Sequence, residues 1–230
     1  MIFEYKQAIW KNKRPWLLVK GVGINDSDYP TSRSEKVGGK KRVVWQCPIY
    51  AKWGGMLERA CYQKHKDKHP AYKDVGVCEK WLKFSNFKAW VDTQVFYPDL
   101  NLDKDLLIPG NKIYTPEACC FVDTSINMLL HRSSPIGEYP LGVSKTHNRN
   151  SFTASVMGRS GYNYHCICSK ATPEEAHAVW QEGKIRVIVE RINSYRDKPE
   201  YRKDVEDALW LRVDQLQSDL DNGRITEKLL

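Results

Sequence analysis

Two carboxylates around a lysine are the residues of this sequence that most directly predict chemistry. Asp103, Lys104 and Asp105 lie in the run LDKDLLIPGNKIYTPEACCFVDTSIN, residues 102–127. Alternate side chains of a β-strand share a face, so Asp103 and Asp105 would lie on the same side of a strand through this run. Carboxylate oxygens are ligands that Mg²⁺ and Mn²⁺ prefer. The spacing therefore predicts a site for one hard divalent ion, with Lys104 balancing the charge of a phosphate bound there.

The elements that would position this site follow along the same run. The sequence predicts a tight turn at residues 109–111 and a second strand at residues 119–122. A helix capped by Thr124 or Ser125 would come next, and polar residues four positions apart would share one of its faces. Strand, turn, strand and helix with converging polar groups is the layout of a one-metal nuclease site. Its candidate ligands are Asp103, Asp105, Asn127 and His131.

A structural interpretation of the same residues stays open. The sequence Asp103, Lys104, Asp105 could simply end a strand and form salt bridges with the basic N-terminal part of the chain. Asn111 could occupy a left-handed turn, which asparagine tolerates better than most residues. In that interpretation the run is a scaffold and not a reaction centre.

The composition excludes several classes of protein. The chain has 230 residues, enough for one large domain or two small ones, and an aromatic content of 11% that argues against disorder. No apolar run approaches the roughly 20 residues of a membrane helix. The N-terminal MIFEYKQAIW lacks the apolar core of a signal peptide. We therefore expect a cytoplasmic protein without membrane contact.

The cysteines predict reduced thiols. There are seven, an odd number, in a chain for which we expect no export. No pair has the two-residue gap with which a zinc knuckle wraps its ion. This spacing disfavours a structural zinc, although Cys61 with His65 leaves one open.

The charge is uneven along the chain. The net charge of +8 divides into +10 over residues 1–92, −3 over 93–139, +4 over 140–171 and −3 over 172–230. Two basic regions thus flank a short acidic one. Nucleic acid is the polyanion that such a surface predicts, because neutralised phosphates release condensed counterions. Lysines that only keep the protein soluble are the simpler alternative, and charge alone does not decide.

The first half predicts a basic arm followed by a helical part. Glycine, Asn, Asp, Ser and Pro crowd residues 20–45, so we expect irregular structure or a mobile basic arm within residues 1–46. Apolar residues at helical spacing from Tyr50 to Cys61 predict a helix with a core stripe. The aromatic residues between 81 and 90 predict further core packing, so the phosphate contacts of that segment would come from Lys80, Lys83 and Lys88.

The last third predicts a three-stranded antiparallel sheet packed on one helix. Phe152, Ala154 and Val156 alternate with Ser and Thr, as in a strand with one buried face. A turn at residues 158–161 and a strand at residues 162–168 follow. Thr172 and Pro173 then predict the N-cap and first residue of a helix. Together the patterns predict an α+β chain with four parts: an arm at 1–46, a small ββα-metal-like core with helices at 47–135, the sheet and helix at 139–192, and a helical tail at 193–230.

Residues 139–184 resemble the Apetala or ethylene-response-factor type of DNA-binding domain. The matching stretches are YPLGVSK, FTASV and TPEEAHAVWQEGK. In that family the sheet lies in the DNA major groove. The third strand departs from the pattern, because HCIC stands where a leucine, a glycine and an aromatic residue are usual. The candidate contacts to duplex DNA are Lys145, His147, Arg149, Arg159, Tyr162 and Tyr164, of which the arginines would contact guanine edges or phosphates.

The central block is similar to small phage homing endonucleases of the HNH type, which pair a ββα-metal nuclease core with such a DNA-binding domain. It carries MLERACYQK, VCEKWLKFSNFKAW, LDKDLLIPGNKIYTPEACCFV and IN, and the resemblance covers most of residues 47–190. HNH sites use a histidine as base and an asparagine or histidine on the helix to hold the ion. Here no histidine lies between residues 70 and 130, and Ala118 stands where a mid-motif asparagine is usual. Asn127 stands at the position expected for the helix ligand. Lys104 and its neighbours Asp103 and Asp105 stand near the position expected for the general base.

Three functions follow from these observations. The resemblance implies a phage-type DNA endonuclease, located in the host cytoplasm, that hydrolyses phosphodiester bonds with one Mg²⁺ or Mn²⁺ ion. Its catalytic residues would be Asp103, Lys104, Asp105 and Asn127. The missing histidine favours the alternative of a non-catalytic DNA-binding protein or regulator. A third hypothesis is a protein that binds another protein through the charged helices of residues 173–220 and has little affinity for DNA.

Overall fold

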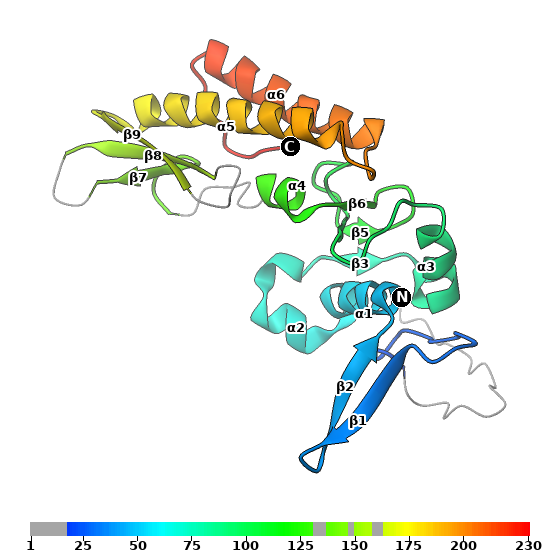
Figure 1. Cartoon of the computed structure of the whole chain (residues 1–230). Helices are drawn as coiled ribbons and strands as arrows, with labels where there is room; N and C mark the ends of the chain where they lie inside the picture. Colours follow the sequence, from blue (N-terminus) through cyan, green and yellow to red (C-terminus); the bar gives the residue numbers. More distant parts are fainter. Residues whose placement is uncertain (1–17, 131–136, 147–149, 158–162) are drawn as a thin grey trace. The chain divides into compact units, whose positions relative to one another are not determined.

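The computed structural model describes residues 18–130, 137–146, 150–157 and 163–230 (Figure 1), without the side chains of residue 157 and residues 163–169. Helices and strands are mixed, which confirms the α+β class. The chain forms two compact units: one of residues 1–98 and 112–117, the other of residues 99–111 and 118–230. None of the helices in the described ranges is long and apolar enough to cross a membrane.

The first unit contains a β-hairpin where composition predicts irregular structure or a mobile arm. Strands β1 (Ser32–Val37) and β2 (Lys40–Gln46) pair antiparallel. Gly38 and Gly39 between them have φ values of 58° and 76°, and positive φ at both positions is the type I′ turn that suits the twist of paired strands. The expectation for residues 20–45 is therefore wrong at this hairpin, because two glycines that indicated irregularity form its turn.

Aromatic side chains fill the core of the first unit, as their spacing predicts. Trp53 of α1, Trp81 and Phe84 have no exposed surface, and Trp53 Nε1 donates a hydrogen bond of 2.7 Å to the Trp81 carbonyl oxygen. The elements around them are α1 (Pro48–Cys61), α2 (Gln63–Lys68), η1 (Pro70–Tyr72), η2 (Glu79–Leu82), α3 (Phe84–Val91) and the parallel pair β3 (Gly76–Val77) with β5 (Ile113–Tyr114).

The second unit begins with a short antiparallel pair and a helix. Strand β4 (Asn101–Asp103) pairs with β6 (Cys120–Val122), and α4 (Thr124–Leu129) follows directly. The N-cap of α4 is Asp123, whose Oδ1 accepts from the backbone N–H of Ile126 at 2.9 Å. The prediction of Thr124 or Ser125 is wrong by one or two residues, because the preceding carboxylate already satisfies the free amide of the first turn.

The predicted three-stranded sheet on one helix is confirmed. Strands β7 (Val143–Lys145), β8 (Phe152–Met157) and β9 (Asn163–Lys170) form an antiparallel sheet in that order. Helix α5 (Pro173–Tyr195) starts with a capping box in which Thr172 accepts from the Glu175 amide and the Glu175 carboxylate accepts from the Thr172 amide. Ala154 and Val156 are buried, and Val156 faces Gly183 of α5. The turn predicted at residues 158–161 lies outside the described residues.

A long helix pair completes the second unit. Helix α5 continues past residue 192 to Tyr195, and α6 (Lys203–Asp221) lies along it (Figure 1). Ile188 and Ile192 of α5 share one core with Leu209 and Leu216 of α6. The core also includes Cys120, Val122 and Ile126, so the strand pair and α4 are anchored on these helices.

Candidate metal site and nucleic-acid interface

Asp103 ends β4, and its carboxylate caps the turn that follows. Oδ1 accepts hydrogen bonds from the backbone N–H groups of Asp105 at 2.9 Å and Leu106 at 2.7 Å. An aspartate that bonds its own downstream backbone competes with the strand ladder. The strand therefore stops at Asp103. The expectation that Asp103 and Asp105 share the face of one strand is wrong for this reason.

Lys104 and Asp105 pair with each other inside the turn. Lys104 is buried, at 8% exposure, and its Nζ lies 3.1 Å from Asp105 Oδ2. Asn111 Nδ2 donates a hydrogen bond of 2.6 Å to the Lys104 carbonyl oxygen, which connects the two ends of the loop. The structural interpretation expected salt bridges from this run to the basic N-terminal part of the chain, whereas Lys104 and Asp105 form one with each other. Lys104 thus compensates a neighbouring carboxylate in this structure.

The environment of Asp103 disfavours its charged form. Burial raises the pKa of Asp103, and the nearby Asp105 carboxylate raises it further, against the two backbone amides and Lys104. Low polarity and a like charge both penalise ionisation of a carboxylate. Asp103 is therefore a turn cap whose ionised form is disfavoured by its surroundings.

Arg212 supports this turn from α6, and sequence reasoning missed it. It has no exposed surface, and its Nη2 donates to the Asp105 carbonyl oxygen at 3.3 Å. Its other N–H groups donate to the carbonyl oxygens of Ala208 at 2.6 Å and Leu230 at 2.7 Å. The available signal was its position between Leu209 and Val213 on the apolar face of the helix. A buried guanidinium satisfied by carbonyl oxygens fixes the turn to the helix pair.

The other predicted metal ligands are only partly described. Asn127 is half-buried in the middle of α4, and His131 lies outside the described residues. Within the described ranges no cluster of three or more His, Cys, Asp or Glu side chains is placed to hold a metal ion. The structure thus brings together Asp103, Lys104 and Asp105. Two candidate ligand groups for an ion remain. One is Asp103 Oδ2, which accepts no hydrogen bond from a residue that the structure describes, and the other is the Asn127 amide.

Lys145 is exposed, but the register places it on the helix side of the sheet. It pairs with Phe152, two positions from the pair Val143 and Ala154, and alternate residues of a strand share a face. Because Ala154 is buried under α5, Lys145 extends from the rim of that face. Tyr164 lies in β9 opposite Val156, with its side chain outside the description. The remaining sheet candidates His147, Arg149, Arg159 and Tyr162 lie outside the described residues.

The open face of β7 and β8 carries hydroxyl groups. Ser144 pairs with Thr153, and Thr146 Oγ1 lies 2.9 Å from Thr153 Oγ1. Ser155 follows Thr153 by two positions and therefore shares its face. Residues 140–171 contain four Lys or Arg and no Asp or Glu. Alternation predicted Thr153 and Ser155 here, whereas Ser144 and Thr146 were missed because β7 is only three residues long.

The three lysines predicted around α3 differ in their surroundings. Lys80, the second residue of η2, and Lys83, its C-cap, are both exposed. Lys88 lies 2.6 Å from Asp92, one helical turn away. A surface pair of this kind contributes little to stability, but it places a carboxylate next to the lysine. Lys80 and Lys83 are therefore better candidates than Lys88 for the predicted phosphate contacts of this segment.

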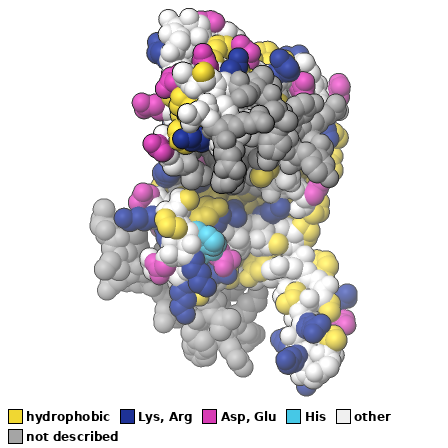
Figure 2. Space-filling model, turned by 90° about the vertical axis from the view of Figure 1, so that its left-hand side faces the viewer, with side chains coloured by type: hydrophobic (Ala, Val, Ile, Leu, Met, Phe, Trp, Pro, Cys, Tyr) yellow, Lys and Arg dark blue, Asp and Glu magenta, His cyan; other side chains and the backbone are white. Residues whose placement is uncertain are grey.

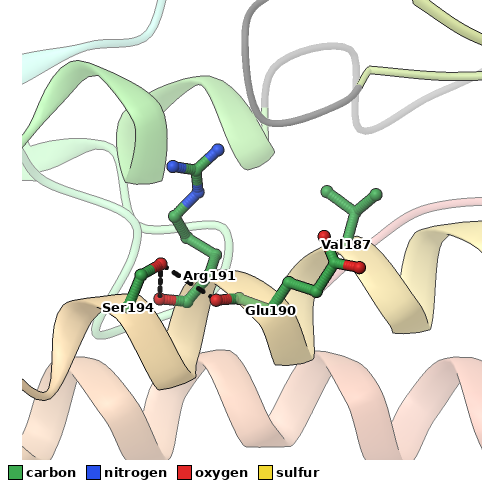
Figure 3. Close-up of a pocket in the computed structure, with 4 residues that line it drawn as sticks. All are labelled: Val187, Glu190, Arg191 and Ser194. Atoms are coloured by element: carbon green, nitrogen blue, oxygen red, sulfur yellow. Dashed lines mark hydrogen bonds between the residues drawn. The ribbon is translucent and has the colours of Figure 1, made fainter.

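Two further features of the described residues are their thiols and a hollow on α5. Burial raises the pKa of the Cys61, Cys78 and Cys120 thiols, which disfavours the nucleophilic thiolate form. A hollow on α5 is lined by Val187, Glu190, Arg191 and Ser194 (Figure 3). The Ser194 hydroxyl there lies 2.9 Å from the Glu190 carbonyl oxygen and 3.2 Å from that of Arg191. The Ser194 hydroxyl proton is therefore donated to backbone carbonyl oxygens of the same helix.

Comparisons of the chain with protein-family models, with curated proteins and with solved structures found no match.

Proposed function

We propose that the protein binds double-stranded DNA and that the open face of the β7–β8–β9 sheet is a contact surface. The observation that carries this proposal is a hydroxyl-bearing sheet face in a segment that contains basic but no acidic residues. Serine and threonine hydroxyls reach both phosphate oxygens and base edges. A segment without carboxylates also meets the phosphate backbone without like-charge repulsion.

Both the packing and the charge support this use of the sheet. Helix α5 covers the other face, where Ala154 and Val156 are buried, so the sheet is held rigid from behind. The side chains that the structure describes on this face of β7 and β8 are polar, so this part of the face needs no apolar partner. The net charge of +8 adds a long-range attraction to any polyanion.

Charge substitution on this face tests the proposal. Thr153→Glu places a carboxylate in the centre of the face, and we expect the affinity for a labelled duplex to fall about tenfold or more in fluorescence anisotropy, as unpaired like charge opposes phosphate contact. Thr93→Glu, at an exposed position of the other unit, changes the net charge equally and should leave the affinity within about twofold. Thr153→Lys should bind at least as tightly as the unaltered protein.

The pair of Thr153 variants separates contact from misfolding. Damage to the fold would weaken binding in Thr153→Glu and in Thr153→Lys alike. If Thr153→Glu and Thr153→Lys both bind the duplex at low salt as tightly as the unaltered protein, the assignment of the sheet is overturned. A protein that shows no affinity for duplex DNA at low salt would overturn the function itself.

Metal-dependent cleavage of DNA is a second candidate function. It is favoured by the order β4, β6, α4 and by Asp103 Oδ2, which no described residue engages. Asp103 with Asn127 would hold a Mg²⁺ or Mn²⁺ ion, which would supply Lewis-acid activation of a phosphate. Plasmid incubated with Mg²⁺, Mn²⁺ or EDTA tests it: nicking that requires metal and is lost in Asp103→Asn supports the nuclease. Tight binding without cutting in either metal leaves the non-catalytic protein.

A further inference from the structure

The β1–β2 hairpin carries an uncompensated cluster of cations. Residues 32–46 contain Arg33, Lys36, Lys40, Lys41 and Arg42, against the single acid Glu35. None of the five cations forms an ion pair with a residue that the structure describes. The charge of the hairpin is therefore available to an outside anion.

The strand register distributes these cations over both faces of the hairpin. Lys36 is directly opposite Lys41, while Glu35 is opposite Arg42 and Val37 opposite Lys40. Residues opposite each other share a face and alternate residues change face, so the Lys36 pair lies on one side and Lys40 and Arg42 on the other. Like charges directly opposite destabilise a strand pair. The hairpin thus has a local electrostatic cost that bound phosphates would remove.

Every residue of the two strands is exposed except the half-buried Ser34. Val37 at 46%, Val43 at 63% and Trp45 at 44% leave apolar surface in water between the cations. In Figure 2 the hairpin is the lobe at the lower right, where Lys and Arg side chains lie beside hydrophobic ones. An isolated two-stranded hairpin is marginally stable in water, and this one gains almost nothing from burial. Both features are typical of an element that completes its contacts on a partner.

We propose that this hairpin is a DNA-binding ribbon that enters the major groove of a duplex. The inference rests on the proposed DNA binding and adds a second contact element in the other compact unit. Six residues of β1 span about 20 Å, and two strands about 5 Å apart fit a groove about 12 Å wide. Cations on both faces bring positive charge close to the phosphates that border the groove. Val43 and Trp45 supply apolar contact to sugars and thymine methyl groups.

Removing the hairpin charge is the direct test. The variant Lys36→Gln, Lys40→Gln, Lys41→Gln, Arg42→Gln loses four cations, and a matched control loses four exposed lysines of the same unit: Lys64, Lys68, Lys73 and Lys112 to Gln. Affinity for a labelled DNA duplex is measured over a salt series for both and for the unaltered protein. We expect the hairpin variant to bind about 10-fold to 100-fold more weakly, with a salt slope lower by about two units or more. The control should change both quantities far less.

Two further arms keep the result interpretable. Lys36→Arg, Lys40→Arg, Lys41→Arg preserves the charge and should retain the affinity, which a hairpin damaged by substitution would not. Double-stranded RNA has a deep, narrow major groove that a ribbon cannot enter, so it should compete poorly with the DNA duplex. Equal competition by that RNA would overturn the groove assignment.

The outcomes distinguish this inference from the proposed function. If the unaltered protein binds DNA and the hairpin variant binds equally well with the same salt slope, the inference is overturned and the proposed function stands. If hairpin and control variants lose the same affinity, the effect is one of net charge and the inference is again overturned. If the unaltered protein has no affinity for DNA, the proposed function fails, and the hairpin proposal fails with it.

Discussion

Lys36 and Lys41 lie directly opposite each other in the β1–β2 ladder, a like-charge pair in a hairpin with almost no buried surface. Lys41→Glu converts it into an opposite-charge pair, which should stabilise the hairpin by about 0.5 kcal/mol. We expect slower hydrogen exchange of the backbone amides in β1 and β2, together with weaker DNA binding. Lys64→Glu is the control for net charge. Faster exchange in Lys41→Glu would contradict the electrostatic cost assigned to this pair.

Asp103 is expected to matter for stability through its acceptor oxygen. Asp103→Ala leaves the backbone N–H groups of Asp105 and Leu106 without their acceptor and should lower the free energy of unfolding by about 1–3 kcal/mol. Asp103→Asn keeps a side-chain oxygen at the same place and removes a charge that burial and Asp105 disfavour, so it should cost less. Urea denaturation measures both. An Asn variant as unstable as the Ala variant would contradict the turn-cap role.

We expect the buried side chain of His177 to make the protein less stable in mild acid. Its Nε2 accepts from the Thr226 amide at 2.9 Å, so Nδ1 carries the proton and donates to the Leu141 carbonyl oxygen at 3.0 Å. Burial lowers the pKa of His177 from 6.5, and the unfolded chain therefore takes up the proton more readily. The stability is present above pH 6.5 and is lost as the pH falls below it.

The measurement compares urea midpoints at about pH 7.5 and about pH 5.5, on either side of the ordinary histidine pKa. The unaltered protein should lose stability between them, and His177→Gln should lose less, whatever its absolute midpoint. An identical pH dependence in the two proteins would mean that His177 is not the titrating group.

Gly142 is required by a close contact as well as by its backbone conformation. Its φ is 72°, and a Cβ there would overlap the indole ring of Trp180. Gly142→Ala should therefore cost about 2–4 kcal/mol, from the left-handed conformation plus overpacking. Gly223→Ala is the matched control, since its φ is 62° but nothing lies within 4 Å of the added carbon. Equal unfolding midpoints of the two variants would contradict the packing of Trp180 on the sheet.

The elements that the sequence predicts well are those with a local cause. The core stripe of α1, the alternation in β8 and the Thr172 cap of α5 each depend on residues within one or two turns of each other. Gly38 and Gly39 were misjudged by composition, although a glycine pair between two strands is a hairpin signal. The strands on either side were not predicted, because their many charged residues lack the alternation of apolar and polar residues that indicates a strand.

The candidate site was less predictable because its contacts are long-range or chemically ambiguous. An aspartate has the same oxygens whether it caps a turn or binds an ion, so the carboxylate of Asp103 does not reveal its role in the sequence. Arg212 reaches the turn from 107 residues away, a contact that no local pattern encodes. The identity of this chain as an HNH-type endonuclease stays a prediction from resemblance.

Titration of the full chain against a labelled duplex over a series of salt concentrations decides whether the protein binds duplex DNA. We expect the logarithm of the association constant to fall linearly with the logarithm of the salt concentration, with a slope of about −0.9 for each phosphate neutralised. The slope should be shallower when the four hairpin cations are removed. Absence of binding at low salt, or binding that does not respond to salt, would contradict the proposed DNA binding.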